Sequence, residues 1–320
     1  MSEALVDCRD TFARTLIELA AADPRIVVVV NDSIGSSNLG SFQAAFPDRV
    51  VNVGIAEQAM VGVSAGLAAA GKIPFVSGAA CFLTGRATEQ LKIDVAYSRA
   101  GVKLCGQAPG MAYGELGPTH HSIEDLSWLR AMPGLTVIVP ADPGETAAAL
   151  RWMAATDGPA YVRIPRLPVP VLPGGNEPFT PGRGRVVRDG GDVSIIATGV
   201  VVHRALAAAD VLAQEGIEAR VVSMPCVSPL DDDLVVACAR QTGRIVTAEE
   251  ALISGGLGAG VARVVVERHP VPMRLLGMDD TLAPTGSETW LLEWAGLSAE
   301  GIARAVSELL DDVGPRAGAL

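Results

Sequence analysis

Residues 25–31 read RIVVVVN, and this run decides the fold class of the chain. Positions 26–30 are consecutive β-branched apolar residues, a pattern typical of a strand buried on both faces of a parallel sheet. The spacing predicts an amphipathic helix over 10–22, a second strand at 50–53 and a helix of small residues over 56–70. Because strands alternate with helices, we predict an α/β fold with mostly parallel sheets flanked by helices.

The same alternation continues on both sides of a segment rich in proline and glycine, residues 165–191. Before it, we predict strands at 74–77, 102–106, 135–139 and 160–164, and helices at 87–100 and 143–155, with Asp142 as the cap of the second helix. After it, we predict strands at 193–197, 218–223 and 244–248, and helices at 202–214, 231–240 and 256–267. A last helix runs to residue 310 and begins after a capping Ser298. We therefore expect two domains, 1–164 and 192–320, joined by a linker at 165–191.

Composition excludes several classes of function. The 320 residues carry a net charge of -11, which argues against a nucleic-acid binder, since such a protein shows a basic stripe. The longest apolar stretch, residues 59–71, is shorter than the roughly 20 residues needed to cross a bilayer. The five cysteines are scattered and form no C-x-x-C pair, which favours free thiols over disulfides or a zinc site. We expect a cytoplasmic protein with no nucleic-acid or membrane partner.

Three segments of the first domain combine polar groups with apolar neighbours. Residues 51–60, VNVGIAEQAM, place Glu57 in the first turn of a helix. That carboxylate either stabilises the helix dipole or, among apolar groups, has a raised pKa and handles a proton. Residues 77–90, SGAACFLTGRATEQ, hold Phe82, which packs in the core or faces a ligand. Residues 114–125, GELGPTHHSIED, put His120 in a loop, where a histidine is a surface residue or serves in proton transfer.

The glycines at 256, 258 and 260 resemble the glycine motif of dinucleotide-binding proteins, since they lie after a predicted strand and before a predicted helix. The spacing of the third glycine does not fit G-x-G-x-x-G, and no acidic residue ends a second strand about 20 positions on. We interpret these glycines as positions of close backbone packing at a helix start.

Four motifs follow in order along the chain: GIAEQAM, PFVSGAACFLTGR, GPTHHSIED and TVIVPADPGE. Through these motifs the first domain resembles the pyrimidine-binding domain of the transketolase family, which includes deoxyxylulose phosphate synthase. The resemblance continues through GPAYVRIPR, VTAEEALISGGLGAGV and LAPTGS, and so covers nearly the whole chain. It implies a thiamine diphosphate-dependent enzyme that transfers a two-carbon ketol unit from a ketose, which we expect to be phosphorylated, to an aldehyde.

The resemblance also implies roles for individual residues. Glu57 matches the glutamate that bonds the aminopyrimidine ring of thiamine diphosphate, and Phe82 matches an aromatic residue that stacks on that ring. His120 matches a histidine that faces the substrate. Arg9 and Arg163 match arginines that bind the substrate phosphate, a use suited to the guanidinium fork.

A loop at the same pocket is matched by residues 31–39, NDSIGSSNL. The resemblance implies that Asp32 lies on the cofactor side of this loop and Ser37 on the substrate side.

Three departures from the family pattern bear on function. Leu116 stands where the family has an acidic residue that reads substrate hydroxyls, with Glu115 beside it, and a second family histidine falls here near Ala108. The chain also lacks the G-D-G motif with which the family holds Mg²⁺ through oxygen ligands. The resemblance therefore implies a split enzyme, in which an N-terminal transketolase-like subunit supplies the diphosphate and Mg²⁺ ligands, and two copies of each chain assemble as α2β2.

Two other functions remain open at this point. A β-type subunit of a 2-oxoacid dehydrogenase or a similar decarboxylating enzyme shares the two-domain plan. A non-catalytic scaffold that kept the fold would not need Glu57 or Phe82.

Overall fold

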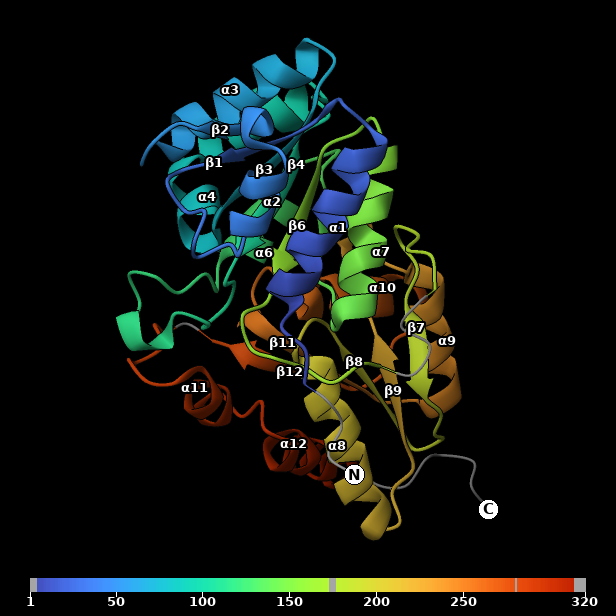
Figure 1. The fold of residues 1–320 in the computed structure, drawn as a ribbon. Coiled ribbons are helices and arrows are strands. Elements are labelled where there is room, and N and C mark those ends of the chain that lie inside the picture. The colour runs from blue at the N-terminus through green and yellow to red at the C-terminus, as the bar shows by residue number, and fades with distance from the viewer. Residues whose placement is uncertain (1–4, 173–176, 280, 314–320) are drawn as a thin grey trace.

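The computed structural model describes residues 5–172, 177–279 and 281–313 of the chain. It contains two α/β domains, and Figure 1 shows the first domain above the second. The described residues leave out four short segments: 1–4 and 314–320 at the ends of the chain, 173–176 in the expected linker, and residue 280.

The strands are β1 (Ile26–Val30), β2 (Val50–Asn52), β3 (Ile73–Ala79), β4 (Lys103–Gln107), β5 (Thr136–Ile138), β6 (Ala160–Ile164), β7 (Arg185–Arg188), β8 (Val193–Ala197), β9 (Ala219–Ser223), β10 (Cys226–Ser228), β11 (Ile245–Leu252) and β12 (Met273–Met278). The α-helices are α1 (Cys8–Ala22), α2 (Gly40–Ala45), α3 (Glu57–Ala69), α4 (Ala80–Arg86), α5 (Thr88–Gln90), α6 (Asp125–Arg130), α7 (Pro143–Ala155), α8 (Val201–Gln214), α9 (Asp232–Thr242), α10 (Leu257–Arg268), α11 (Glu288–Trp294) and α12 (Ala299–Val313). The 3₁₀ and π segments are η1 (Pro47–Arg49), η2 (Leu91–Tyr97) and η3 (Gly114–Leu116).

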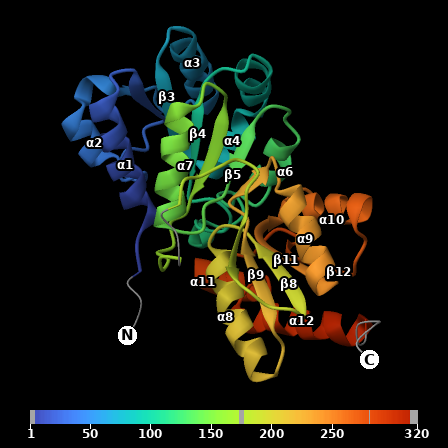
Figure 2. The same ribbon diagram turned by 90° about the vertical axis from the view of Figure 1, so that its right-hand side faces the viewer.

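The first sheet has the order β10-β5-β6-β4-β3-β1-β2 within the described ranges, and its strands are parallel except for β10. Strand β1 is buried at every position, as the run of β-branched residues predicts. Val29 packs with α3 and α4, whereas Val28 and Val30 face the core beneath α1 and α7. Figure 2 shows α1 and α7 side by side on that face of the sheet.

The first domain differs from the expected elements in several places, and the short helices α2, α4 and α6 were not predicted. The helix expected over 87–100 is instead α5 followed by the π-helical segment η2. Strand β10 comes from the second half of the chain, yet it pairs antiparallel with β5 and extends the first sheet. This pairing depends on how the two domains meet, so local sequence does not specify it.

The second sheet has the order β12-β11-β8-β9-β7 in the same ranges, again parallel except at one edge. That edge is β7, which lies in the segment expected to be linker and pairs antiparallel with β9. Helices α8 and α12 pack against each other at the foot of this domain (Figure 1). Ser298 caps α12 as expected, since its hydroxyl accepts a hydrogen bond from the backbone N–H of Gly301 at 3.0 Å.

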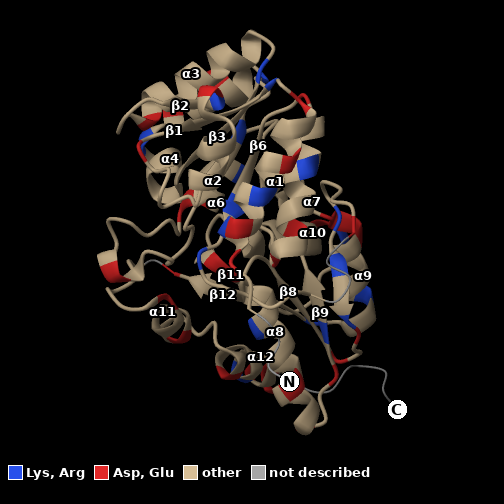
Figure 3. Cartoon of the chain, viewed as in Figure 1, with Lys and Arg blue, Asp and Glu red and all other residues tan. Residues whose placement is uncertain are grey.

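Acidic and basic residues are interspersed along the elements of both domains in the view of Figure 3. None of the helices in the described residues has the length and apolar character required to cross a membrane.

Candidate active site

The carboxyl ends of neighbouring parallel strands position the polar groups of the candidate site. Asn31 and Asp32 follow β1 directly, and Glu57 begins α3 a few residues after β2. Phe82 lies in α4, which follows β3 without a break. In α/β sheets this edge is the usual place for a ligand, because the strands deliver loops and helix starts to one crevice. Asp32 adopts a left-handed backbone with φ 66°, which aspartate tolerates and which turns the chain away from the sheet.

Glu57 is held by two side-chain donors. The Asn31 Nδ2 group donates to Glu57 Oε1 at 2.8 Å, and Arg86 Nη1 donates to the same oxygen at 3.0 Å. The Glu57 side chain is only 3% exposed, whereas that of Arg86 is half exposed. Burial acts to raise the pKa of Glu57, but bonds from its own backbone N–H, Asn31 and Arg86 outweigh burial and lower the pKa. The expectation of a raised pKa is therefore wrong, because it rested on the apolar neighbours in the sequence alone.

Aromatic rings form a wall beside this carboxylate. The ring centroids of Phe82 and His120 lie 5.1 Å apart in an edge-on arrangement, and Tyr113 meets His120 at 6.1 Å in the same way. The guanidinium carbon of Arg86 lies 4.0 Å from the centroid of Phe82, a cation–π contact. Thr119 Oγ1 and His120 Nδ1 are 2.9 Å apart, which fixes the orientation of the imidazole. Arg86 therefore joins the carboxylate to the aromatic wall.

These groups line one cavity of about 370 Å³. Its lining comprises Asn31, Asp32, Ser33, Ser36, Ile55, Glu57, Ala79, Phe82, Arg86, Tyr113, Leu116 and His120. Four residues singled out from the sequence, Asp32, Glu57, Phe82 and His120, thus meet in one place. Asn31, Arg86 and Tyr113 were not predicted from the sequence; the signal for Asn31 was its position just past the end of β1.

Ser37 and Arg9 do not line this cavity. Ser37 is fully buried and accepts a hydrogen bond from Ser77 Oγ at 3.0 Å, and Ser77 in turn accepts one from Gln107 Nε2 at 3.0 Å. Arg9 forms an ion pair with Asp7, with 2.6 Å between Nη2 and Oδ2. In this structure Ser37 stabilises the loop through its hydrogen bond to Ser77, and the ion pair of Arg9 with Asp7 stabilises the start of α1.

Arg163 is buried between the two domains. Its Nε donates to Asp125 Oδ2 at 3.0 Å, Nη1 to the carbonyl of Glu250 at 3.0 Å and Nη2 to the carbonyl of Ser122 at 3.1 Å. Nη2 also pairs with Asp125 Oδ1. Burial opposes the charge, yet the ion pair with Asp125 raises the pKa of Arg163 above its ordinary value. A guanidinium committed in this way does not fit the expected phosphate-binding role, which remains a prediction without geometric support.

A second cavity, also of about 370 Å³, adjoins the first and shares Tyr113 and Leu116 with it. Arg166 and Glu288 line it, and the guanidinium carbon of Arg166 lies 5.3 Å from the Tyr113 ring centroid. Burial and the nearby Glu250 raise the pKa of Glu288 to about 8. Arg163 and Arg166 both lie at the carboxyl end of β6. Of the two, Arg166 is exposed and can therefore contact a ligand.

Leu116 and Ala108, the two positions at which the chain departs from the family pattern in the expected substrate region, have different surroundings. Leu116 is 55% exposed and lines both cavities. Ala108 is buried, with only 1% of its surface exposed, and has φ 49°, a strained value for alanine. Only Leu116 is thus placed to touch a substrate.

The glycine-rich segment at 256–260 packs closely, as its sequence predicts. Glu249 accepts hydrogen bonds from the backbone N–H groups of Leu257 and Gly258, at 2.6 and 2.7 Å, and so caps α10. A Cβ at Gly256 would overlap Glu249 Oε2, and one at Gly260 would lie 2.5 Å from Arg130 Nη2. A carboxylate of the chain itself fills the place where a dinucleotide phosphate would bind.

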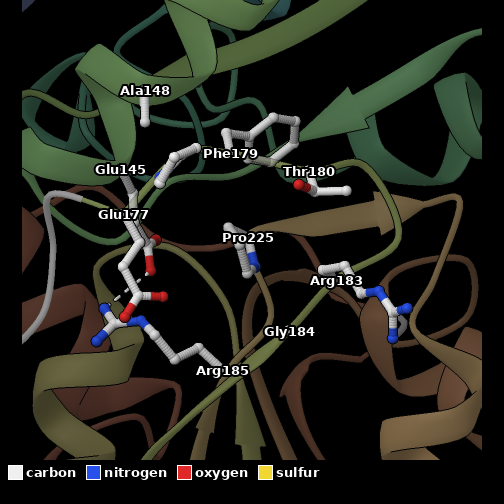
Figure 4. Close-up of a pocket in the computed structure, with 10 residues that line it drawn as sticks. Glu145, Ala148, Glu177, Phe179, Thr180, Arg183, Gly184, Arg185 and Pro225 are labelled. Carbon is white, nitrogen blue, oxygen red and sulfur yellow. Dashed lines mark ion pairs between the residues drawn. The ribbon is translucent and has the colours of Figure 1, made fainter.

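Another cavity, of about 230 Å³, lies between α7 and the segment that enters β7 (Figure 4). Glu145 and Arg185 face each other there at 3.5 Å between Oε1 and Nη2, and Phe179 forms part of the wall. This cavity contains none of the predicted site residues. Glu145 also accepts a hydrogen bond from Ser223 Oγ at 2.8 Å, so it links the two domains.

Potential metal ligands do not gather in groups of three or more His, Cys, Asp or Glu within residues 5–172, 177–279 and 281–313.

Comparison with known protein families covers both domains. The model of the transketolase pyrimidine-binding domain matches residues 4–171, and the model of the transketolase C-terminal domain matches residues 182–302.

Several known proteins are similar over nearly the whole chain. A 6-deoxy-6-sulfo-D-fructose transketolase subunit from Clostridium sp. is 41% identical over 303 residues, which cover 95% of this chain and 94% of the relative. An apulose-4-phosphate transketolase subunit from Phocaeicola vulgatus is 41% identical over 311 residues, 97% of this chain and 99% of the relative. The 1-deoxy-D-xylulose-5-phosphate synthase of Gloeobacter violaceus is 38% identical, but the match spans 93% of this chain and only 47% of that enzyme.

A solved structure has the same fold. It is described as a split-gene transketolase in an inactive β4 tetramer, and it superposes with a TM-score of 0.88 at 40% identity over 96% of this chain and 99% of its own.

Proposed function

The chain belongs to the transketolase family, as a subunit of the split type, and from this premise we propose that it supplies the pyrimidine-binding half of a thiamine diphosphate-dependent ketol transferase. The observation that carries this proposal is the meeting of Glu57, Phe82 and His120 in one cavity at the carboxyl end of the first sheet.

The cavity suits the ring half of that cofactor. Glu57 offers a buried carboxylate beside the aromatic ring of Phe82, and the buried Oδ1 of Asn31 has no hydrogen-bond partner among the described residues. An aminopyrimidine presents an amino group that can donate to the amide oxygen, and a ring nitrogen that can share a proton with a carboxylate. The described lining contributes one arginine, Arg86, and Glu57 already pairs with it, so the diphosphate needs other ligands.

Within the proposed site, each residue has a distinct task. Glu57 would share a proton with the ring nitrogen through Oε2, because Asn31 and Arg86 both donate to Oε1. Phe82 would pack against the ring, and His120, oriented by Thr119, would face the substrate. When bound, the cofactor supplies the carbon nucleophile that carries the two-carbon unit, and the protein supplies orientation and proton handling.

We propose a ketose with an anionic terminal group as the donor. The names of two relatives include a sulfonated sugar and a phosphorylated sugar, both anionic. In this chain the exposed Arg166, in the second cavity beside Tyr113, is the guanidinium suited to such a group. For Arg163 this role remains a prediction, and its buried ion pair with Asp125 does not support it.

The proposal requires a partner chain. An N-terminal transketolase-like subunit would supply the diphosphate-binding domain and the Mg²⁺ ligands, and two copies of each chain would form an α2β2 assembly. The similarity to a split-gene transketolase supports a divided enzyme. The cytoplasmic location remains a prediction.

The test is a ketol-transfer assay on this chain mixed with its partner, with thiamine diphosphate and Mg²⁺ present. Transfer from a phosphorylated or sulfonated ketose to an aldehyde supports the proposal. Oxidation of pyruvate with a dye acceptor, without ketol transfer, would instead assign the chain to the 2-oxoacid dehydrogenase type. Activity that persists in the Glu57→Ala variant would favour the scaffold function.

A further inference from the structure

We propose that Leu116 selects the substrate, so that the enzyme prefers an acceptor aldehyde lacking a hydroxyl group on the carbon that lies against this side chain. This inference rests on the proposed function and concerns the same cavity. Leu116 lines the space it shares with His120 and also the adjoining cavity with Arg166. A chain that extends from the reacting carbon near His120 to an anionic end near Arg166 therefore passes over Leu116.

The backbone holds Leu116 in this position. Its N–H donates to the carbonyl of Tyr113 at 2.8 Å, and the next residue, Gly117, has φ 74° and donates to Gly114 at 3.2 Å. Gly114 also accepts a hydrogen bond from Gly286 at 3.0 Å, which ties this turn to the second domain. The placement of the leucine is thus a property of both domains rather than of a loose loop.

The neighbouring carboxylate does not replace the missing polar group. Glu115 lines the second cavity together with Arg166, and it does not line the cavity that contains Glu57 and His120. The loop after β1 contributes hydroxyls to the main cavity, where Ser33 Oγ donates to the carbonyl of Ser77 at 3.3 Å and Ser36 Oγ to the carbonyl of Ser33 at 3.1 Å. Ile55, Tyr113 and Leu116 provide an apolar side to the same space.

The energetic consequence follows from desolvation. A hydroxyl pressed against Leu116 would lose its water without gaining a protein partner, which disfavours it. Apolar pockets reject an added hydroxyl only moderately, by up to about 10²-fold, because the substrate can shift to keep some water. We expect a preference of roughly tenfold in kcat/KM for the deoxy compound, since Leu116 is partly exposed.

The experiment uses the assembled enzyme, this chain with its diphosphate-binding partner, and hydroxypyruvate as the two-carbon donor. Three acceptors are compared: D-ribose 5-phosphate and its 2-deoxy and 3-deoxy analogues. We expect one deoxy analogue to exceed ribose 5-phosphate by roughly tenfold in kcat/KM. In Leu116→Asp this advantage disappears or reverses, because the carboxylate then accepts a hydrogen bond from the hydroxyl group.

Glu89→Gln is the control, since this exposed carboxylate on α5 lines neither cavity, and it keeps the wild-type acceptor preference. Leu116→Met keeps an apolar side chain at this position and therefore also keeps the wild-type acceptor preference. The proposal is overturned if ribose 5-phosphate is equal or superior to both analogues in the wild type, or if Leu116→Asp leaves the ratio unchanged. A failure to transfer to any acceptor would instead refute the proposed function.

Discussion

Glu57 in the first domain and Glu249 and Glu250 in the second are glutamates with little exposed surface, yet their pKa values move in opposite directions. Burial raises the pKa of Glu249 and of Glu250 to about 7, even though backbone N–H groups donate to both. At Glu57, donors that include Asn31 and Arg86 outweigh burial and lower the pKa. The difference lies in the partners: two polar side chains serve one carboxylate, whereas mainly backbone groups serve the others.

The comparison shows which buried charges are available for chemistry. Glu57 borders a cavity, and its partner Arg86 is half exposed, so a ligand can reach both. Glu249 caps a helix, and Glu250 accepts a hydrogen bond from the Met111 N–H at 2.7 Å at the junction of the domains. A perturbed pKa is therefore not sufficient evidence of a functional site, because structural carboxylates show the larger perturbation here.

Substitution at Glu57 should produce the largest functional effect. Glu57→Gln keeps the shape of the side chain but cannot hold or accept a proton as a carboxylate does. We expect ketol-transfer activity of the assembled enzyme to fall by roughly 10²–10⁴-fold. The control Glu89→Gln changes an exposed carboxylate on the neighbouring α5 and should retain activity. Near-normal turnover by Glu57→Gln would remove this residue from the mechanism.

Substitution at the domain junction should instead affect stability. Arg163→Met leaves Asp125 buried without its ion-pair partner, which costs about 3–5 kcal/mol of the free energy of unfolding. Chemical denaturation of the purified chain measures this loss. Arg166→Met, at the exposed arginine three residues on, should change stability by less than about 0.5 kcal/mol. Equal stability of the two variants would contradict the structural role of Arg163.

The pH dependence of stability should report the buried carboxylate that caps α10. The pKa of Glu249 rises from 4.5 to about 7 on folding, so the folded protein binds this proton more tightly than the unfolded chain. Its contribution is therefore greatest below about pH 4.5 and declines as the pH rises to about 7, by about 3 kcal/mol. Glu249→Gln should flatten the fall of unfolding free energy in that interval. An unchanged pH profile in this variant would show that Glu249 does not carry the effect.

The smallest effect should come from the partner of Glu57. Arg86→Met removes a hydrogen bond and a positive charge that lower the pKa of Glu57, so that pKa rises and protonation occurs at higher pH. The acidic limb of the activity profile should then move to higher pH, while stability changes by less than about 1 kcal/mol because the Arg86 side chain is half exposed. Arg86→Lys keeps the charge and should move the limb less. A limb that stays in place would mean that Arg86 does not tune Glu57.

Local signals in the sequence predict much of this fold. The β-branched run gives β1, and the Asp142 cap followed by Pro143 gives the start of α7, with the Asp142 carboxylate accepting from the Glu145 N–H at 2.7 Å. Strands β10 and β12 were not predicted, because β10 is short and both form only through neighbours distant in the sequence.

The candidate site also has a part that the sequence predicts and a part that it does not. Asp32, Glu57, Phe82 and His120 share a cavity because each follows the end of a strand or lies in the loop that covers it. The surroundings of Arg163 could not be predicted, since its partners Asp125, Ser122 and Glu250 come from separate segments of both domains. The lowered pKa of Glu57 likewise depends on Asn31 and Arg86, which lie 26 and 29 residues away.

The central claim is that this chain holds the ring half of a site that a partner completes. Calorimetric titration of thiamine diphosphate and Mg²⁺ into this chain alone, and into its mixture with an N-terminal transketolase-like subunit, tests that claim most directly. We predict tight binding only in the mixture, and its loss when the chain carries Glu57→Gln. Tight binding to this chain alone, or binding to the mixture that is unaffected by Glu57→Gln, would contradict it.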